Sequence, residues 1–378
     1  MPLTLLATVG TSLLQSNIRP LGNQPTRTPV EEQLWQACVS RRWAALAQLL
    51  LQHVPATERL CGAEINCLHQ LVHTKRLPIE RVFFLVSDTD DGRATGEILE
   101  AYFSTSEWFG NNGATYLVVD DLLPQDPKRF KTKGLRNLVR RMGECISRVG
   151  NAADVAIDAT GGFKAQIAVA VTMGQALNIP VYYKHELFPE IIDFPALPVQ
   201  INYDLLGRYA GLLTALEKGE LRTASEWDEP VTDEVRLFMN EEAIDGETVL
   251  ELNYLGQLFL QSYRLRYPYI PALRPATADE RKEPTFGNDH HYAKGFKAYV
   301  QKVFAENAFI KTIHTVSYEG QAQIKSIGFS VKDVGTEKQL IGTYRSDFGN
   351  RFRLRLTDES TGALIWAAEF LSRTYARE

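Results

Sequence analysis

Short apolar runs alternate with longer amphipathic stretches over the first 200 residues. The apolar runs are rich in Val, Leu and aromatic residues, and they predict β-strands at 3–10, 81–88, 115–121, 154–160 and 180–185. The stretches between them, such as 30–52 and 131–149, have helical periodicity. Apolar strands separated by helices predict a parallel sheet that is covered on both faces, with a ligand at the carboxyl ends of its strands.

The pattern changes after residue 200. It predicts a helix at 204–219, a hairpin at 235–252 that turns near Asp245-Gly246, and a helix at 253–264. Helices combined with a hairpin resemble a winged helix-turn-helix module. Four prolines between 265 and 289 then predict a linker without regular structure.

The last segment predicts an α+β domain. A helix at 292–310 is followed by strand-like runs at 324–333, 338–347, 351–358 and 363–373. Since no helix separates these runs, the sheet should be antiparallel. We therefore expect an α/β protein divided into domains at 1–200, 201–264 and 290–378, with 265–289 as the linker.

Composition narrows the class of protein. Apolar residues make up 44% of the chain, and neither a signal peptide nor a membrane span is predicted. The four cysteines form no CxxC pair, so we expect neither a zinc site nor a disulfide framework, and a reduced, cytoplasmic protein. Charge is uneven: residues 204–252 carry 13 acidic and four basic residues, whereas residues 288–378 carry 13 basic and 10 acidic ones.

The turn from the strand at 154–160 into the next helix has the composition of an anion site. Thr160 is followed by Gly161 and Gly162, and Lys164 falls in the first helical turn. Glycines let backbone amides approach a ligand, while the helix N-terminus and the lysine supply positive charge. The GxGxxG and GxxxxGK[ST] fingerprints are absent, which disfavours NAD and ATP. A glycine turn that serves packing alone remains the alternative.

Two other strand ends carry polar residues that should lie nearby. These are Thr8, Gly10, Thr11 and Ser12 after the first strand, and Ser87, Asp88 and Thr89 after the second. Because parallel strands share their carboxyl edge, the three ends predict one pocket for phosphates, sugars and base edges.

Together, the stretches 8–14, 158–165 and 180–199 resemble a CARF domain, the Rossmann-like sensor of CRISPR-associated proteins. The resemblance implies a homodimer that binds one cyclic oligoadenylate made by a type III CRISPR complex, with tetra-adenylate the commonest ring among relatives. It assigns Thr11, Ser12, Gly161, Gly162 and Lys164 to the phosphates and riboses. A two-fold dimer suits a symmetric ligand because both half-sites present the same groups.

The acidic charge of residues 204–252 argues against duplex DNA as a partner, because phosphate binding depends on Lys and Arg. We expect this module to be a spacer that couples the dimer. A docking surface for a basic protein is the alternative.

The C-terminal domain should decide the activity. The spaced Arg and His of HEPN ribonucleases are absent, since a proline-containing loop separates Arg281 from His290. A metal-dependent PD-(D/E)xK nuclease remains an alternative, although Gln323 and Lys325 lack the required carboxylate. A ligand-responsive regulator without catalysis is a further alternative.

A row of arginines favours RNA chemistry instead. Arg351, Arg353 and Arg355 alternate with apolar residues, which predicts a strand with guanidinium groups on one face. Such a face can bind an RNA backbone and stabilise a phosphorane without a metal ion. A solvated basic face is the alternative.

The order of elements and the stretches 344–356 and 369–375 resemble the RelE family of mRNA interferases. The resemblance implies cleavage of mRNA in the ribosomal A site, by attack of the RNA 2′-hydroxyl on the adjacent phosphate. By position it makes Arg353 and Arg373 catalytic, with Tyr375 and Arg345 beside them. The family's lysine pair is replaced by residues 340–345, so Lys332, His290 and His291 are candidates for the general base. No cofactor is expected beyond the cyclic oligoadenylate activator.

Overall fold

The computed structural model describes residues 2–106, 108–109, 113–185, 188–198, 200–219, 222–227, 230–287, 291–316 and 324–376. The chain divides into two compact units, Met1–Gln200 and Ile201–Glu378. Within the described ranges, every helix is too short or too polar to cross a membrane.

The first unit is built on a six-stranded sheet in the order β3-β2-β1-β4-β5-β6. Its strands are β1 (Leu3–Thr8), β2 (Ile79–Ser87), β3 (Ala114–Val119), β4 (Val155–Asp158), β5 (Val181–Tyr183) and β6 (Ile192–Phe194). The first five pair in parallel, as the apolar runs predict, and their side chains form a buried core. The short strand β6, which the pattern does not predict, pairs antiparallel with β5.

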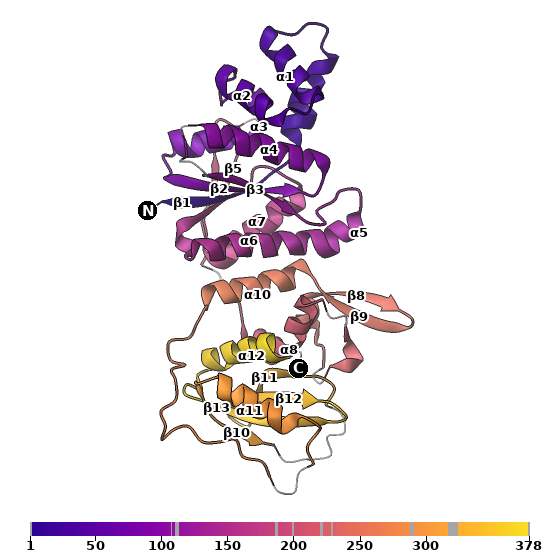
Figure 1. Cartoon of the computed structure of the whole chain (residues 1–378), viewed down its shortest axis with the longest axis vertical. Coiled ribbons are helices and arrows are strands. Elements are labelled where there is room, and N and C mark those ends of the chain that lie inside the picture. The colour runs from indigo at the N-terminus through magenta and orange to yellow at the C-terminus, as the bar shows by residue number, and fades with distance from the viewer. Residues whose placement is uncertain are drawn as a thin grey trace. The chain divides into compact units, whose positions relative to one another are not determined.

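Helices cover both faces of this sheet. They are α1 (Pro29–Val39), α2 (Trp43–His53), α3 (Gly62–His69), α4 (Asp90–Thr105), α5 (Pro127–Arg129), α6 (Leu135–Val149) and α7 (Lys164–Leu177). Figure 1 shows α4 on one face of the sheet and α6 and α7 on the other. The covered sheet confirms the prediction of an α/β class.

The helical stretch 30–52 is two helices rather than one. Arg41 has a left-handed backbone, with φ of 52°. The Arg41 and Arg42 amides donate to the Cys38 and Ala37 carbonyls, which ends α1 in a Schellman-type turn. Helix α2 can therefore fold back and pack against α4.

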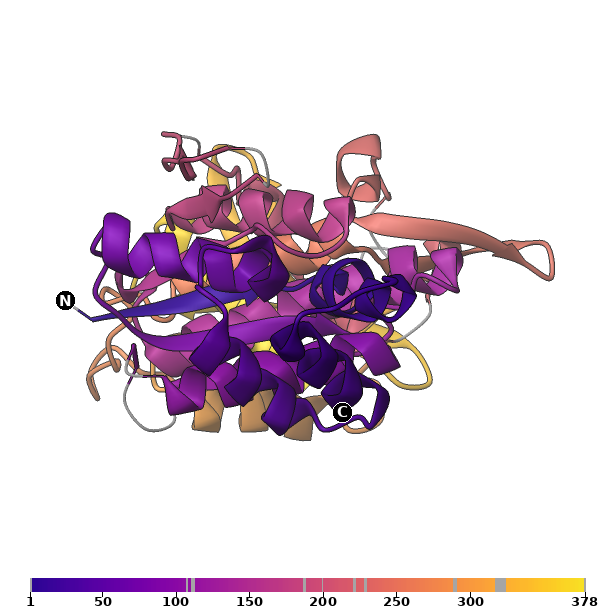
Figure 2. The same cartoon turned by 90° about the horizontal axis from the view of Figure 1, so that it is seen from above.

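The second unit begins with a small helical module. It contains α8 (Asp204–Glu217), β7 (Arg222–Thr223), α9 (Asp233–Arg236), β8 (Met239–Ile244), β9 (Glu247–Leu252) and α10 (Tyr254–Arg266). The predicted hairpin is present: β8 and β9 pair antiparallel, and Asp245 and Gly246 between them both have positive φ. Figure 2 shows this hairpin reaching away from the helices of its own unit. With α9 only four residues long, the winged-helix designation stays a prediction.

A four-stranded antiparallel sheet follows, in the order β10-β13-β12-β11. Its elements are α11 (Phe296–Glu306), β10 (Ile310–Thr315), β11 (Gly328–Val334), β12 (Glu337–Arg345), β13 (Gly349–Leu356) and α12 (Thr361–Tyr375). Phe352, Leu354 and Leu356 of β13 are buried, and the arginines between them are partly exposed. The alternation that the sequence predicts for this strand is confirmed.

The prediction of a strand at 363–373 was wrong, because this segment lies within helix α12. Ala363, Ala367 and Leu371 recur at helical spacing and are buried. Ser360 caps the helix, its hydroxyl accepting a hydrogen bond from the Ala363 amide at 3.4 Å. A segment that is apolar on nearly every side fits a buried helix as well as a buried strand.

The helical module and the C-terminal sheet share one hydrophobic core, which runs from Tyr203 to Tyr375. Charged side chains also connect the helical module to the C-terminal sheet and its helix. Arg264 of α10 lies 2.7 Å from Glu217 of α8 and 2.7 Å from Glu369 of α12. Removing one partner of such a buried cluster typically costs about 3 to 5 kcal/mol. Residues 201–264 and 290–378 are thus parts of one compact unit rather than two separate domains.

Close packing of β12 on β13 makes Gly342 a test of this core. A Cβ atom there would lie 2.3 Å from the Phe352 ring. We expect Gly342→Ala to lower the free energy of unfolding by about 2 kcal/mol, because overpacking forces the ring to move. Urea denaturation measures the effect. Gly362→Ala is the control, since nothing lies within 4 Å of its Cβ position; equal stability of the two variants would contradict the packing described here.

Candidate functional site

The carboxyl ends of β1 and β4 meet in a tightly packed corner. The Thr8 hydroxyl donates to the Gly161 carbonyl at 2.7 Å, and the Gly10 amide donates to Glu64 Oε1 at 2.9 Å. The Thr160 amide donates to Asp158 Oδ1 at 3.0 Å. The first bond joins the two strand ends, the second ties the end of β1 to α3, and the third orders the end of β4.

Two glycines in this corner cannot be replaced freely. A Cβ atom on Gly161 would lie 2.2 Å from Glu64 Oε1 and 2.8 Å from the Thr8 carbonyl oxygen. Gly162 has φ of 100°, a conformation that side chains disfavour. The turn is therefore built for close approach of backbone to backbone, and it leads directly into α7.

Helix α7 presents its N-terminus and a lysine at this turn. The Phe163 amide donates to the buried Gln166 side chain at 2.7 Å, which orders the first turn of the helix. Lys164, the first residue of α7, is exposed. Partial positive charge at the helix N-terminus thus lies beside a full positive charge, an arrangement that favours an anion.

A cavity of about 440 Å³ lies over this corner. Its lining includes Lys164, Lys184 and His185, and no carboxylate is found among the described residues that line it. Lys184 follows β5; its amide donates to the Thr160 hydroxyl at 2.9 Å, and its ammonium to the Phe188 carbonyl at 2.9 Å. The charge of this lining suits a phosphate-bearing ligand.

Most of the residues predicted for the sensor line this one cavity. They are Gly10, Thr11, Ser12, Ser87, Thr160, Gly161, Gly162 and Lys164. Thr8 is fully buried beneath the corner, where its hydroxyl holds Gly161. Asp88 and Thr89 line a neighbouring cavity instead. There Thr89 caps α4 by accepting from the Gly92 amide, and Asp88 pairs with Arg93 at 2.6 Å.

Sequence reasoning missed several residues of the cavity. These are Val9, Gln15, Ser16, Ala63, Phe163, Ile167, Tyr183, Lys184 and His185. A signal was present for the last three, because they stand at the carboxyl end of a predicted strand. Ala63 comes from α3, a helix that carries no motif.

Two carboxyl groups are buried under the cavity. Glu64 is 1% exposed, and burial raises its pKa to about 7, against the lowering effect of the Gly10 amide. Asp158 is fully buried, and burial raises its pKa to about 6. Neither Glu64 Oε2 nor Asp158 Oδ2 has a hydrogen-bond partner among the described residues.

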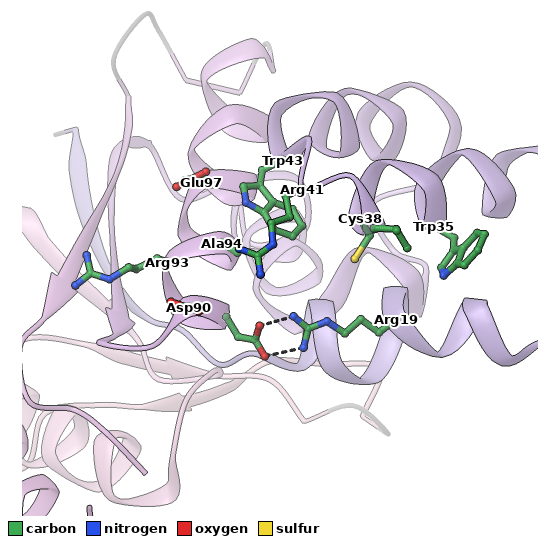
Figure 3. Close-up of a pocket in the computed structure, with 11 residues that line it drawn as sticks. Arg19, Trp35, Cys38, Arg41, Trp43, Asp90, Arg93, Ala94 and Glu97 are labelled. Carbon is green, nitrogen blue, oxygen red and sulfur yellow. Dashed lines mark hydrogen bonds and ion pairs between the residues drawn. The ribbon is translucent and has the colours of Figure 1, made fainter. Parts of the chain in front are cut away.

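A second cavity, of about 470 Å³, lies between α1, α2 and α4 (Figure 3). In Figure 3 Arg41 lies beside Trp43, and dashed lines join the Arg19 guanidinium to its carboxylate partner, Asp91. The lining carries three arginines and three carboxylates, so its charges balance. This cavity does not favour a ligand with several phosphates.

In the second unit, the predicted arginines gather on one face of the four-stranded sheet. Arg351, Arg353 and Arg355 share this face by strand alternation, and register adds Lys332 and Arg345 from the neighbouring strands. We call these five residues the basic face.

The guanidinium groups of the basic face are only partly satisfied. Arg351 Nε and Arg353 Nε are buried and lack a hydrogen-bond partner among the described residues. Arg353 Nη2 lies 3.8 Å from Glu337 Oε2, and Arg355 Nη2 lies 2.8 Å from Glu359 Oε2. A buried donor without a partner costs about 1 to 3 kcal/mol, so an anion placed here would relieve that cost.

The structure does not bring Arg373 and Tyr375 to the basic face. Both belong to α12, which packs on the apolar face of the sheet. Arg373 lies 3.3 Å from Glu369. Tyr375 is buried, its hydroxyl donating to Glu306 and accepting from Asn307, each at 2.8 Å. Their expected position beside Arg353 came from the resemblance to the RelE family.

A histidine that sequence reasoning missed does share the basic face. His314 of β10 pairs directly with Arg353 across the sheet. It is exposed, and its Nδ1 lies 2.6 Å from the Thr285 hydroxyl oxygen. Of the histidines considered as a base, His291 is exposed in the loop before α11, and His290 falls outside the described residues.

Metal-ligating side chains do not cluster in the described part of the chain: no group of three or more His, Cys, Asp or Glu residues lies close enough to hold an ion.

Comparison with known proteins adds one relationship. Among curated proteins, no sequence matches this chain. Of the solved structures, Can2 from Sulfobacillus thermosulfidooxidans in complex with cyclic tetra-adenylate is 10% identical, with 94% of this chain and 77% of that chain covered and a TM-score of 0.26. Protein VC1899 from Vibrio cholerae is 9% identical with the same coverages and a TM-score of 0.23. Scores this low do not establish a common fold.

A family model gives the firmer result. Residues 59–197 match the model of a CRISPR-associated protein family, Cas_APE2256. The matched segment includes Glu64, Gly161, Lys164 and Lys184, which form one side of the corner and its cavity. Over this segment, the first unit is similar to a CRISPR-associated family.

Proposed function

We propose that this protein is a ribonuclease of type III CRISPR defence that a cyclic oligoadenylate activates. The ligand is cyclic tetra-adenylate. The first unit binds it as one half of a homodimer. The second unit cleaves mRNA in the ribosomal A site without a metal ion. The observation that carries the proposal is the cavity over the glycine corner, whose described lining holds no carboxylate and is formed in part by a segment similar to a CRISPR-associated family.

The cavity supports the choice of ligand through its chemistry. Backbone amides, the N-terminus of α7 and two lysines favour phosphates, and the hydroxyls of Thr11, Ser12 and Thr160 suit riboses. An aromatic ring, Phe163, lies at the same edge and offers a surface for a base.

The basic face supports the proposed reaction. Partly buried guanidinium groups without full partners are suited to bind an RNA phosphate and to stabilise the charge that builds up on it. We assign phosphate binding to Arg351 and Arg353, with Arg345, Arg355 and Lys332 around them.

His314 supplies the base in this proposal. Its imidazole accepts the proton of the RNA 2′-hydroxyl while the 2′-oxygen attacks the adjacent phosphorus. The bond from phosphorus to the 5′-oxygen breaks, and that oxygen takes a proton from solvent, leaving a 2′,3′-cyclic phosphate. The pairing of His314 with Arg353 across β10 and β13 supports these two roles.

Ligand binding is tested with Lys164→Gln. Losing one charged contact to a phosphate should weaken cyclic tetra-adenylate binding at least about tenfold. Isothermal titration calorimetry with cyclic tri-, tetra- and hexa-adenylate and linear tetra-adenylate measures affinity and ring preference. Lys338→Gln, the same change at an exposed site of the second unit, should bind like the wild type. Unaltered affinity in Lys164→Gln would refute this site.

The catalytic assignment is tested with Arg353→Ala. We expect cleavage of mRNA on translating ribosomes to fall at least about a hundredfold, because the variant lacks the central phosphate ligand. Affinity for cyclic tetra-adenylate should not change. Lys338→Ala serves as the control, since Lys338 lies on the opposite face of β12 and pairs with Asp333. Full activity of Arg353→Ala would exclude the basic face as the active site.

The base is tested by the pH dependence of cleavage. In the wild type, the rate should rise with pH, because only a neutral imidazole can accept the proton of the 2′-hydroxyl. His314→Gln should lower the rate about a hundredfold and remove that rise. If the variant keeps the rise, another group is the base. Cleavage of free nucleic acid that requires magnesium or manganese would favour a metal-dependent nuclease, and RNA binding without cleavage would favour a regulator.

A further inference from the structure

Glu64 touches both glycine turns of the corner with one oxygen atom. Its Oε1 accepts the Gly10 amide at 2.9 Å. The same atom fills the space where a side chain on Gly161 would begin. The carboxyl group therefore forms the floor beneath the backbone that lines the cavity.

No described cation forms an ion pair with this buried carboxyl group. Asp158 of β4 is the charged group that acts on it. Cys61 and Cys67 lie three residues before and after it in the chain. The helical turn 13–18, which also packs against α3, carries no ionisable side chain. Lys164, Lys184 and His185 line the cavity on the far side of the glycine backbone.

This placement creates an electrostatic conflict with the proposed ligand. A phosphate bound at the glycine turns would lie close to an ionised Glu64. Backbone atoms, and not water, would separate the two negative charges. Two like charges in such surroundings repel strongly, whereas a neutral carboxyl group does not. Because burial already raises the pKa of Glu64 to about 7, protonation near neutral pH costs little.

We propose that Glu64 is a positioning residue that takes up one proton when the anionic ligand binds. The proton comes from solvent and bonds to the carboxyl group, and Oε1 continues to accept the Gly10 amide. No other bond forms or breaks. The inference rests on the proposed function of the cavity as an anion site.

The sign of the pH effect follows from this linkage. The ligand prefers the protonated form, so its dissociation constant is lowest at acidic pH. It rises with pH once Glu64 ionises in the free protein, above about pH 7. A side chain at position 64 that stays neutral should remove this pH dependence of the dissociation constant.

The test measures cyclic tetra-adenylate affinity for the full chain between about pH 6 and about pH 8.5. The affinity of the wild type should fall about tenfold from the lowest to the highest pH of this range. The Glu64→Gln variant should bind cyclic tetra-adenylate tightly, and its affinity should change little with pH. The oxygen of its side-chain amide can still accept the hydrogen bond from the Gly10 amide. Glu64→Ala should bind weakly at every pH, since the Gly10 amide then lacks its acceptor.

Two controls separate this residue from its neighbours. His185→Gln removes the histidine from the cavity lining, and it should keep most of the wild-type dependence. Asp158→Asn should keep a pH dependence but move it to lower pH, because the charge of Asp158 helps to raise the pKa of Glu64. Thermal melting confirms that each variant is folded.

A second measurement needs no variant. Calorimetry of the wild type near pH 7.5, in buffers with different ionisation enthalpies, should show net proton uptake on binding, an uptake that Glu64→Gln lacks. Binding without proton uptake, or equal pH dependence in wild type and Glu64→Gln, would overturn the inference and leave the proposed function standing. Absence of binding at every pH would overturn both.

Discussion

The contact of Glu64 with the Gly10 amide and the Gly161 backbone is the constraint around which the first unit is arranged. It requires β1 and β4 to be neighbours, because only adjacent parallel strands bring their carboxyl ends this close. It also requires α3 to deliver a carboxyl group to the same point. The cavity lies over the glycine turns, where these elements leave little room for a side chain on Gly161.

Much of this unit could be predicted from the sequence. Parallel strands buried on both faces consist of nearly continuous apolar runs, and the glycines after Thr160 marked the turn correctly. Glu64 could not be found in this way, because an acidic residue in a short amphipathic helix is indistinguishable from a solvated one. Its burial depends on tertiary packing that no local pattern records.

In the second unit, the alternation around Arg353 was sufficient to predict a strand with two distinct faces. Residues 363–373 are apolar at almost every position, and a helix buried in a core and a strand buried in a sheet then have the same composition. Arg373 and Tyr375 were expected beside Arg353 from the family resemblance, but both belong to α12, which packs on the apolar face of the sheet. His314 was missed because its value depends on strand pairing, which joins residues far apart in the chain.

The common core of the helical module and the C-terminal sheet has an evolutionary consequence. Because Arg264 is bound at once to α8 and α12, the last ninety or so residues are not an independent cassette that recombination can exchange alone. A replacement for the C-terminal sheet would have to arrive with its own helical module or rebuild this core. The boundary at which a whole compact unit can be exchanged lies instead near residue 200.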